Sequence, residues 1–435
     1  MNTRLRQKSV VGFVLTTMIM MATQITVARE MPNVKAERQG MSAERLERIT
    51  EMTQSYVDDK KLAGIITMVA RRGKIVHFEA VGQRGADDKT PLKKDDLFRI
   101  YSMTKPITAA AVMQLYEQGK FQLSDPVSKF VPELADLKVL NEDGEQVAAE
   151  REMTMQQLLT HTAGFSYGFN PKGDPVDKFY AEANLWAAKD LDEFAQKVAK
   201  LPLKFNPGDQ WHYSIAVDIT GLVVQRISGQ PFDKYLQVNM FEPLGMVDTF
   251  FQVPPEKADR FLPNHYINPE TKLLTTIPKG KPEAMQDYHS VSLYSGGGGL
   301  VSSTMDYMRF AEAMRNGGSL DGKRILGAKT VAYMASNHLP ASIVSGGSGE
   351  KPTLGQQLRG FGFGLGFGLV TDPVAAGVIG SAGEFNWGGA AGTVFWIDPV
   401  EDIVAVGMIQ LMGSPYSFRS DLKVATYQSI TETSE

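Results

Sequence analysis

Residues 97–106, LFRIYSMTKP, form an apolar segment that runs into a serine followed by a lysine three residues later. Pro106 is tolerated in the first turn of a helix but would break its middle, so we expect a helix to begin at Ser102 and to continue through the alanine-rich residues 107–116. Residues three apart share one helix face, which places the Lys105 ammonium beside the Ser102 hydroxyl at a positively polarised helix N-terminus. The stretch predicts a serine nucleophile, provided that partners elsewhere complete it, because S-x-x-K alone is common.

The composition limits the kinds of function that the chain can have. With 435 residues, 43% hydrophobic and 22% charged, it is long and apolar enough for one large or two medium globular domains. A net charge of -4 gives no basic field for nucleic acid or anionic lipid. The absence of cysteine excludes thiolate nucleophiles, Cys-ligated zinc, disulfides and a lipid-modified cysteine. Serine chemistry is therefore the natural expectation.

We expect neither a metal site nor a cofactor. The six histidines form no H-x-x-x-H or H-E-x-x-H pair, and the acidic residues lack the spacing of a calcium loop. The expected partner is a small-molecule ester or lactam substrate.

The N-terminus has the outline of a secretory signal peptide, which we place at residues 1–28. Basic residues at positions 4, 6 and 8 precede an apolar run over 10–22, and Thr26-x-Ala28 offers small residues for cleavage. The apolar run is short for a membrane span; an uncleaved single-helix anchor is the alternative. We expect the mature chain to have no membrane span and to be exported, either periplasmic or secreted.

The pattern of strands and helices predicts an α/β fold in which the two ends of the chain form one sheet. A hairpin is expected at 65–70 and 75–81, helices at 43–60, 304–315 and 421–430, and strands at 360–370, 378–382, 392–397 and 403–411. Residues 105–290 instead lack convincing strand pairs and contain helical segments at 155–160, 191–200 and 219–227. We therefore expect a discontinuous sheet domain, 29–105 and 290–435, and a mostly helical inserted domain, 106–289. A cleft at their junction would hold the site.

Two further segments can complete a site around Ser102. Tyr213 lies in the loop 208–214, GDQWHYS, and a lysine ammonium beside it would favour its phenolate, which makes it a candidate general base toward Ser102 and acid toward the leaving group. The alternative is a half-buried tyrosine with an ordinary hydrogen bond. Residues 386–393, NWGGAAGT, place small residues beside a strand, where a backbone N–H can join that of Ser102 around a developing oxyanion. The alternative there is a bulge or turn.

Together, and in this order, these three segments resemble the serine β-lactamase and penicillin-binding-protein superfamily, in its class C-like branch, and most closely the family VIII carboxylesterases. Residues 158–164, LLTHTAG, and 296–300, GGGGL, add to the resemblance. It implies a β-lactamase-like fold with a mixed or antiparallel sheet. It also implies that Ser102 is the acylated nucleophile and that Lys105 and Tyr213 share its activation.

The same resemblance places Trp387, Gly388 and Gly389 on the strand where relatives carry Lys-Thr-Gly, and it implies an oxyanion hole made by the N–H groups of Ser102 and Ala390. Two departures bear on the substrate. Where many β-lactamases carry Tyr-x-Asn, this chain has Ile215 in the third position, and Trp387 replaces the lysine that suits a carboxylate. Both changes favour a neutral ester, whose apolar part gains an indole wall.

Three other patterns are weaker candidates. Residues 164–168, GFSYG, match the nucleophile elbow G-x-S-x-G, but they follow a helical segment instead of a strand, so Ser166 is not our nucleophile. The glycines at 296–299 lack the lysine of a phosphate-binding loop and indicate close backbone approach near the cleft. His161 and His212 have no necessary role beside a lysine and a tyrosine.

The sequence thus predicts an exported serine hydrolase that cleaves short-chain or aryl carboxylic esters through an acyl-enzyme. The alternative enzyme is a β-lactamase or D-amino-acid peptidase that acts on cell-wall-like substrates. A non-catalytic penicillin-binding scaffold is the alternative from another class.

Overall fold

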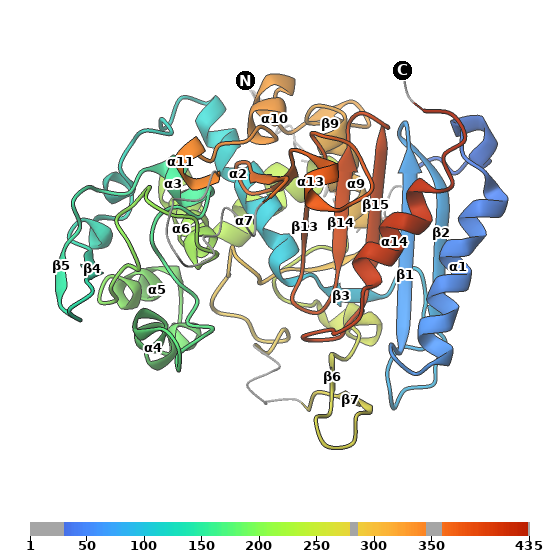
Figure 1. Ribbon diagram of the computed structural model, residues 1–435, viewed down its shortest axis with the longest axis horizontal. Helices are drawn as coiled ribbons and strands as arrows, with labels where there is room; N and C mark the ends of the chain where they lie inside the picture. The colour runs from blue at the N-terminus through green and yellow to red at the C-terminus, as the bar shows by residue number, and fades with distance from the viewer. Residues whose placement is uncertain (1–29, 279–285, 345–358, 434–435) are drawn as a thin grey trace, which may run out of the picture.

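The computed structural model describes residues 30–278, 286–344 and 359–433, and a seven-stranded antiparallel sheet lies at its centre (Figure 1). The strands follow the order β11-β12-β13-β14-β15-β1-β2. Their bounds are Gly64–Arg71 for β1, Lys74–Gly82 for β2, Phe361–Phe363 for β11, Gly368–Val370 for β12, Phe385–Gly388 for β13, Val394–Asp398 for β14 and Ile403–Met408 for β15. β1 pairs with β15, with Ile66 opposite Met408, so the predicted joining of the two chain ends is confirmed.

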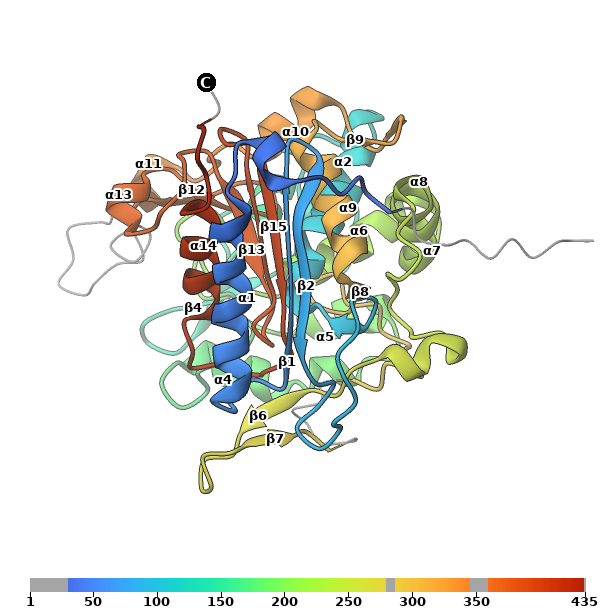
Figure 2. The ribbon, with the colours of Figure 1, turned by 90° about the vertical axis from the view of Figure 1, so that its right-hand side faces the viewer.

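Helices cover both faces of this sheet, and the alternation of side chains along β1 explains why. Ile65 and Val69 belong to a core under α1 (Ala43–Asp58) and α14 (Phe418–Tyr427), whereas Ile66 and Met68 belong to the larger core on the opposite face. Successive strand residues point to opposite faces, so a continuous apolar run predicts a strand buried on both sides. Figure 2 shows α1 and α14 on one face and α9 (Thr304–Arg315) on the other.

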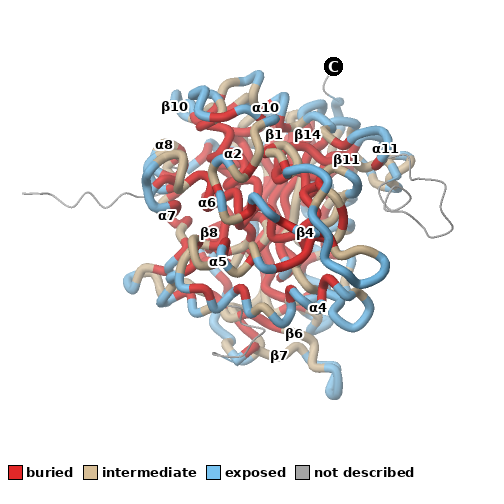
Figure 3. The backbone as a smooth tube through the Cα atoms, turned by 90° about the vertical axis from the view of Figure 1, so that its left-hand side faces the viewer, coloured by how far each residue is buried: buried red, intermediate tan, exposed pale blue. Residues whose placement is uncertain are grey.

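The predicted helical region between the sheet segments surrounds α2 (Thr104–Glu117), whose residues 104–115 are all buried. The other helices of this region are α3 (Met155–Leu159), α4 (Pro175–Glu182), α5 (Leu191–Val198), α6 (Ala216–Ser228), α7 (Phe232–Leu236) and α8 (Glu242–Leu244). Beyond it in the chain lie α10 (Ala328–Met334), α11 (Ala341–Val344) and α13 (Pro373–Ala376). One buried cluster runs from the sheet through α2 into the helices from α3 to α8 (Figure 3), so the two regions share a core. The domain division at 105/106 and 289/290 stays a prediction.

The helical region also contains strands that the sequence did not reveal. β4 (Lys138–Leu140) pairs with β5 (Gln146–Ala148), and β6 (His265–Ile267) pairs with β7 (Leu274–Thr276). Three-residue strands are too short to show an alternating pattern. The remaining short pairs join β3 (Leu97–Arg99) to β8 (Val301–Ser303) and β9 (Ser319–Leu320) to β10 (Lys323–Arg324).

Two strand predictions near the C-terminus are wrong in detail. Residues 360–370 form the hairpin of β11 and β12 instead of one strand, because Gly366, with φ of 87°, turns the chain between them. Residues 378–382 form no strand. They follow α13, which Asp372 caps, and they lie at the surface, where Ile379 is exposed, so their apolar residues have no sheet face to cover.

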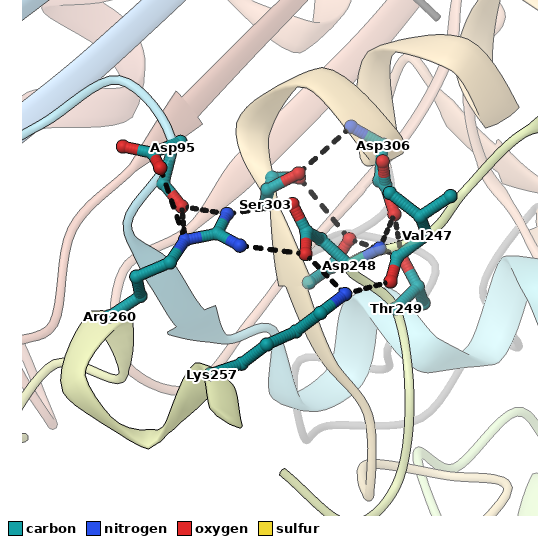
Figure 4. Close-up of polar contacts among 9 residues, drawn as sticks. Asp95, Val247, Asp248, Thr249, Lys257, Arg260, Ser303 and Asp306 are labelled. Carbon is teal, nitrogen blue, oxygen red and sulfur yellow. Dashed lines mark hydrogen bonds and ion pairs between the residues drawn. The ribbon is translucent and has the colours of Figure 1, made fainter. Parts of the chain in front are cut away.

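A polar cluster holds α9 in place (Figure 4). The Asp306 carboxylate accepts the Asp248 N–H at 2.6 Å and the Thr249 hydroxyl at 2.9 Å, while Asp248 pairs with Lys257 at 2.8 Å and with Arg260 at 2.7 Å. Burial raises the pKa of Asp306 to about 7. One residue later, the Tyr307 hydroxyl donates to Met103 O at 2.9 Å. α9 is thus anchored at one end and holds the turn that carries Ser102.

No helix in the described part of the chain has the length and apolar character needed to cross a bilayer. The predicted signal peptide, residues 1–28, lies outside the described residues.

Candidate active site

Ser102 lies in a tight turn between β3 and α2. Residues 101–103 form a single 3-10 turn, and α2 continues from Thr104. Tyr101 adopts a φ of 43°, an uncommon conformation for a bulky residue, and its hydroxyl accepts a hydrogen bond from Asn264 at 2.7 Å. Tyr101, in this uncommon conformation, directly precedes Ser102. Its hydrogen bond with Asn264 holds the turn, so that Ser102 stays at the N-terminal end of the buried helix.

Lys105 is buried, with three acceptors around its ammonium. Nζ donates to Gly297 O at 2.7 Å, to the Tyr167 hydroxyl at 2.8 Å and to Ser102 Oγ at 3.4 Å. It also lies 4.6 Å from the centre of the Tyr213 ring. A buried ammonium needs such partners to remain charged, and here one of them is the serine oxygen.

Tyr213 lines the same cavity as Ser102, and its hydroxyl oxygen lies 2.6 Å from Ser102 Oγ. Its loop is fixed by backbone hydrogen bonds from Gly208 to Thr162 and from His212 to His161. The Tyr213 ring packs 4.9 Å from the His161 ring. The structure therefore brings together all three residues that we assigned to catalysis from the sequence, with a contact short enough to pass a proton.

Tyr167 and Asp218 also belong to this site, and sequence reasoning did not find them. The Asp218 carboxylate accepts the Gly297 N–H at 2.9 Å and the Ser295 hydroxyl at 2.5 Å. The Gly297 carbonyl thus accepts a hydrogen bond from Lys105, and the Gly297 N–H donates one to Asp218. A Cβ on Gly297 would lie 2.3 Å from Asp218 Oδ2 and 2.9 Å from the Tyr167 oxygen, so only glycine fits. The glycine run predicted a close backbone approach near the cleft, and the structure has one at Gly297. This approach brings the Gly297 carbonyl within hydrogen-bond distance of Lys105.

The electrostatics of this inner layer keep Tyr167 neutral. Burial, followed by the nearby Asp218 carboxylate, raises the pKa of Tyr167 well above its usual value. Burial also raises the pKa of Asp218, an effect that the Lys105 ammonium opposes. Tyr167 therefore holds its proton and binds Lys105 through its oxygen, as a fixed support for the ammonium.

We expect Tyr167→Phe to lower kcat/KM by about 10-fold to 100-fold, because a hydrogen bond to a charged group contributes about 1.5–3 kcal/mol and Lys105 would lose one of its acceptors. Steady-state kinetics with a nitrophenyl ester measure the effect. Tyr235→Phe is the matched control, since the Tyr235 hydroxyl is buried and has no hydrogen-bond partner among the described residues. Equal activity of the two variants would contradict the role given to Tyr167.

Ser166, the serine of the G-x-S-x-G match, is not placed for catalysis. It is completely buried, and its hydroxyl donates to Asp177 Oδ1 at 2.5 Å, with His212 Nε2 at 3.5 Å. In a Ser-His-Asp triad the histidine lies between the serine and the aspartate, whereas here serine and aspartate are bonded directly. His161 is neutral because burial lowers its pKa well below the usual value, and its Nδ1 lies 3.3 Å from Ser214 Oγ.

The end of β13 supplies the other wall of the site. A Cβ on Gly389 would lie 2.5 Å from Ile100 O, so glycine lets the strand pack against the chain just before Ser102. The Ala390 N–H has no acceptor within the described ranges, which leaves it free for an oxyanion. The Trp387 ring lies 5.6 Å from the Tyr213 ring and forms an apolar wall.

Arg419 of α14 approaches the same strand, which the sequence did not predict. Its Nη2 donates to Gly389 O at 2.6 Å, and a Cβ on Gly388 would lie 2.6 Å from the guanidinium carbon. Trp387 stands where the resemblance in sequence would place a lysine. A cation nevertheless reaches this strand, because the Arg419 guanidinium comes from the C-terminal helix.

A cavity of about 890 Å³ opens in front of Ser102. Its wall includes Tyr213, Phe169, Trp387, Ile379 and Arg419. This volume is larger than a short acyl group requires. In the described part of the chain, no group of three or more His, Asp or Glu side chains is arranged to bind a metal ion.

Known proteins resemble this chain over most of its length. The family model "Beta-lactamase" matches residues 49–427. The chain is 34% identical over 357 residues to Protein Rv1367c of Mycobacterium tuberculosis, covering 80% of this chain and 86% of the relative. It is 30% identical over 366 residues to Esterase EstB of Burkholderia gladioli, covering 81% and 86%. Among solved structures, "EstCE1, a hydrolase with promiscuous acyltransferase activity" shares the fold, with a TM-score of 0.75 and 24% identity over 88% of this chain and 99% of that chain.

Proposed function

Because the chain belongs to the beta-lactamase family and is a serine hydrolase, we propose that it is an exported carboxylesterase that cleaves short-chain or aryl esters through an acyl-enzyme on Ser102. The observation that carries the proposal is the 2.6 Å contact between Tyr213 and Ser102 in front of an apolar Trp387 wall. Esterase EstB, a relative that aligns with most of this chain, supports the ester as the substrate class.

The positions of these groups support the following acylation step. The Tyr213–Lys105 pair, when it holds one proton fewer than its fully protonated form, takes the proton of Ser102 while Oγ attacks the ester carbonyl carbon. The N–H groups of Ser102 and Ala390 stabilise the negative oxygen that forms. The same pair then returns the proton to the departing alcohol oxygen, and the acyl group stays on Ser102.

Deacylation repeats these roles with water as the nucleophile. Water gives its proton to the Tyr213–Lys105 pair, attacks the acyl carbon and releases the carboxylic acid, while the proton returns to Ser102. The cycle uses only side chains and backbone groups of this chain.

A second candidate function is supported by Arg419. A β-lactamase or D-amino-acid peptidase needs a cation for the carboxylate of its substrate, and the Arg419 guanidinium lies against Gly389 at the edge of the cavity. That guanidinium already donates to the Gly389 carbonyl, and the Trp387 indole beside Tyr213 forms an apolar wall of the same cavity. We therefore rank the esterase first.

We expect kcat/KM for nitrophenyl butyrate to exceed that for a chromogenic cephalosporin by about 100-fold or more, because the apolar wall favours the uncharged substrate. Stopped-flow kinetics should also show a burst of nitrophenol at one equivalent per active site. A preference for the cephalosporin would reverse our ranking of the two functions.

Export rests on the sequence of residues 1–28 alone. We propose cleavage after Ala28 and a periplasmic or secreted mature protein. N-terminal sequencing of the purified native protein tests this, and retention of Met1 in a soluble cytosolic fraction would refute it.

A further inference from the structure

Two large aromatic side chains are exposed near the catalytic groups. Phe169 is 75% exposed and lines the same cavity as Ser102 and Tyr213. Trp186 is 41% exposed. An exposed aromatic side chain in the wall of a cavity, with a second exposed aromatic ring stacked on the same neighbour, marks a binding surface.

These rings stack on a residue of the catalytic layer. Phe169 lies 4.9 Å from Tyr167 with an angle of 17° between the rings, and Trp186 lies 6.2 Å from Tyr167 at 22°. The Tyr167 hydroxyl binds Lys105, which in turn contacts Ser102. Ser102 is therefore connected through Lys105 and Tyr167 to the exposed ring of Phe169.

The backbone around Phe169 is held on both sides by one carboxylate. Asp177 accepts the Ser166 hydroxyl at 2.5 Å and the Asn170 N–H at 2.8 Å, and the Gly168 N–H donates to Ser166 Oγ at 3.1 Å. Lys204 pairs with Asp177 at 2.9 Å and keeps that carboxylate in place. The exposed ring is therefore mounted on a fixed loop.

Gly168 shows how closely this loop is fitted. Its φ is 78°, and a Cβ there would lie 2.8 Å from the Ala181 N of α4. Glycine at position 168 of the G-x-S-x-G match is thus needed for the shape of the loop. A fixed ring loses little conformational entropy when a ligand stacks on it.

We propose that Phe169, supported by Tyr167 and Trp186, is the binding platform for a planar aromatic group of the ester substrate. The proposal rests on the proposed esterase function and makes esters with a planar aryl group its preferred substrates. Stacking on the exposed ring places that group in the cavity that Ser102 faces. Aliphatic short-chain esters react at the same serine without using the platform.

The test compares Phe169→Ala with Phe169→Leu and with the matched control Phe179→Ala, another exposed phenylalanine, located on α4. The substrates are 2-naphthyl butyrate, ethyl 2-naphthoate and ethyl butyrate. We expect Phe169→Ala to lower kcat/KM by about 10-fold for at least one naphthyl ester and by less than about 2-fold for ethyl butyrate. Phe169→Leu should lie between, and Phe179→Ala should match the native enzyme.

The naphthyl ester that responds identifies whether the platform takes the alcohol or the acyl part. An equal fall for all three substrates, or no fall for either naphthyl ester, would overturn the platform while leaving the esterase function intact. If the native protein hydrolyses none of the esters, the proposed function fails, and binding of 2-naphthol and 2-naphthoate measured by tryptophan fluorescence then decides the platform. About 10-fold weaker binding of either by Phe169→Ala supports it, and unchanged binding of both overturns it.

Discussion

Ser102→Ala is expected to lower kcat by a factor on the order of 10⁴ or more, because it removes the oxygen that accepts the acyl group. Mass spectrometry after incubation with a slow acylating agent should show one adduct on Ser102 in the native protein and none in the variant. The fold should be unaffected, since the Ser102 side chain is small and, among the described residues, its hydrogen bonds are those to Lys105 and Tyr213.

Ser166→Ala is the control for this prediction. Its hydroxyl lies in the interior against Asp177, so the variant should keep nitrophenyl butyrate turnover within a few-fold of the native level and should still label on Ser102. Loss of turnover in Ser166→Ala with normal turnover in Ser102→Ala would show that the nucleophile is misassigned. Absence of any covalent adduct in the native protein would favour the non-catalytic scaffold.

The parts of the fold that the sequence predicted are those in which one segment carries its own signal. β1 is a continuous apolar run, β2 alternates between buried and more exposed residues, and a short turn joins the two strands. The Thr304–Arg315 helix begins at a capping serine, Ser303. The position of Lys105 beside Ser102 follows from helix geometry alone. Residues 378–382 failed because a short apolar run resembles a strand even where no sheet is available to cover it.

The parts of the site that were missed depend on contacts between distant segments. Tyr167 looked like the variable residue of a weak motif, and its role appears only when its loop is folded against Lys105. Asp218 acts through the backbone of Gly297, for which no side-chain pattern exists. Arg419 reaches β13 from the C-terminal helix. The run of glycines at 296–299 was the one available signal, and it indicated close approach without naming the partners.

Tyr213→Phe is expected to lower kcat by about 10²-fold to 10⁴-fold with little change in KM, because it removes the phenol oxygen 2.6 Å from Ser102 and keeps the ring. The ring contacts with His161 and Trp387 remain, so the apolar wall of the cavity should be preserved. Among the described residues, Lys105 Nζ, at 3.4 Å, would then be the remaining hydrogen-bond partner of Ser102 Oγ. Burst and steady-state kinetics with nitrophenyl butyrate separate acylation from turnover.

The double variant with Lys105→Met decides whether the phenol and the amine act as one unit. Groups that share a proton lose their effect together, so Lys105→Met and the double variant should each be about as slow as Tyr213→Phe. Multiplicative losses would mean that the two groups act independently. Near-native activity of Tyr213→Phe would contradict the role of Tyr213 as a base toward Ser102. Lys105 would then activate the serine without the phenol, although its ammonium also donates to Gly297 and Tyr167. Thermal unfolding of each variant, compared with the native protein, shows whether loss of the buried ammonium disturbs the fold instead of the chemistry.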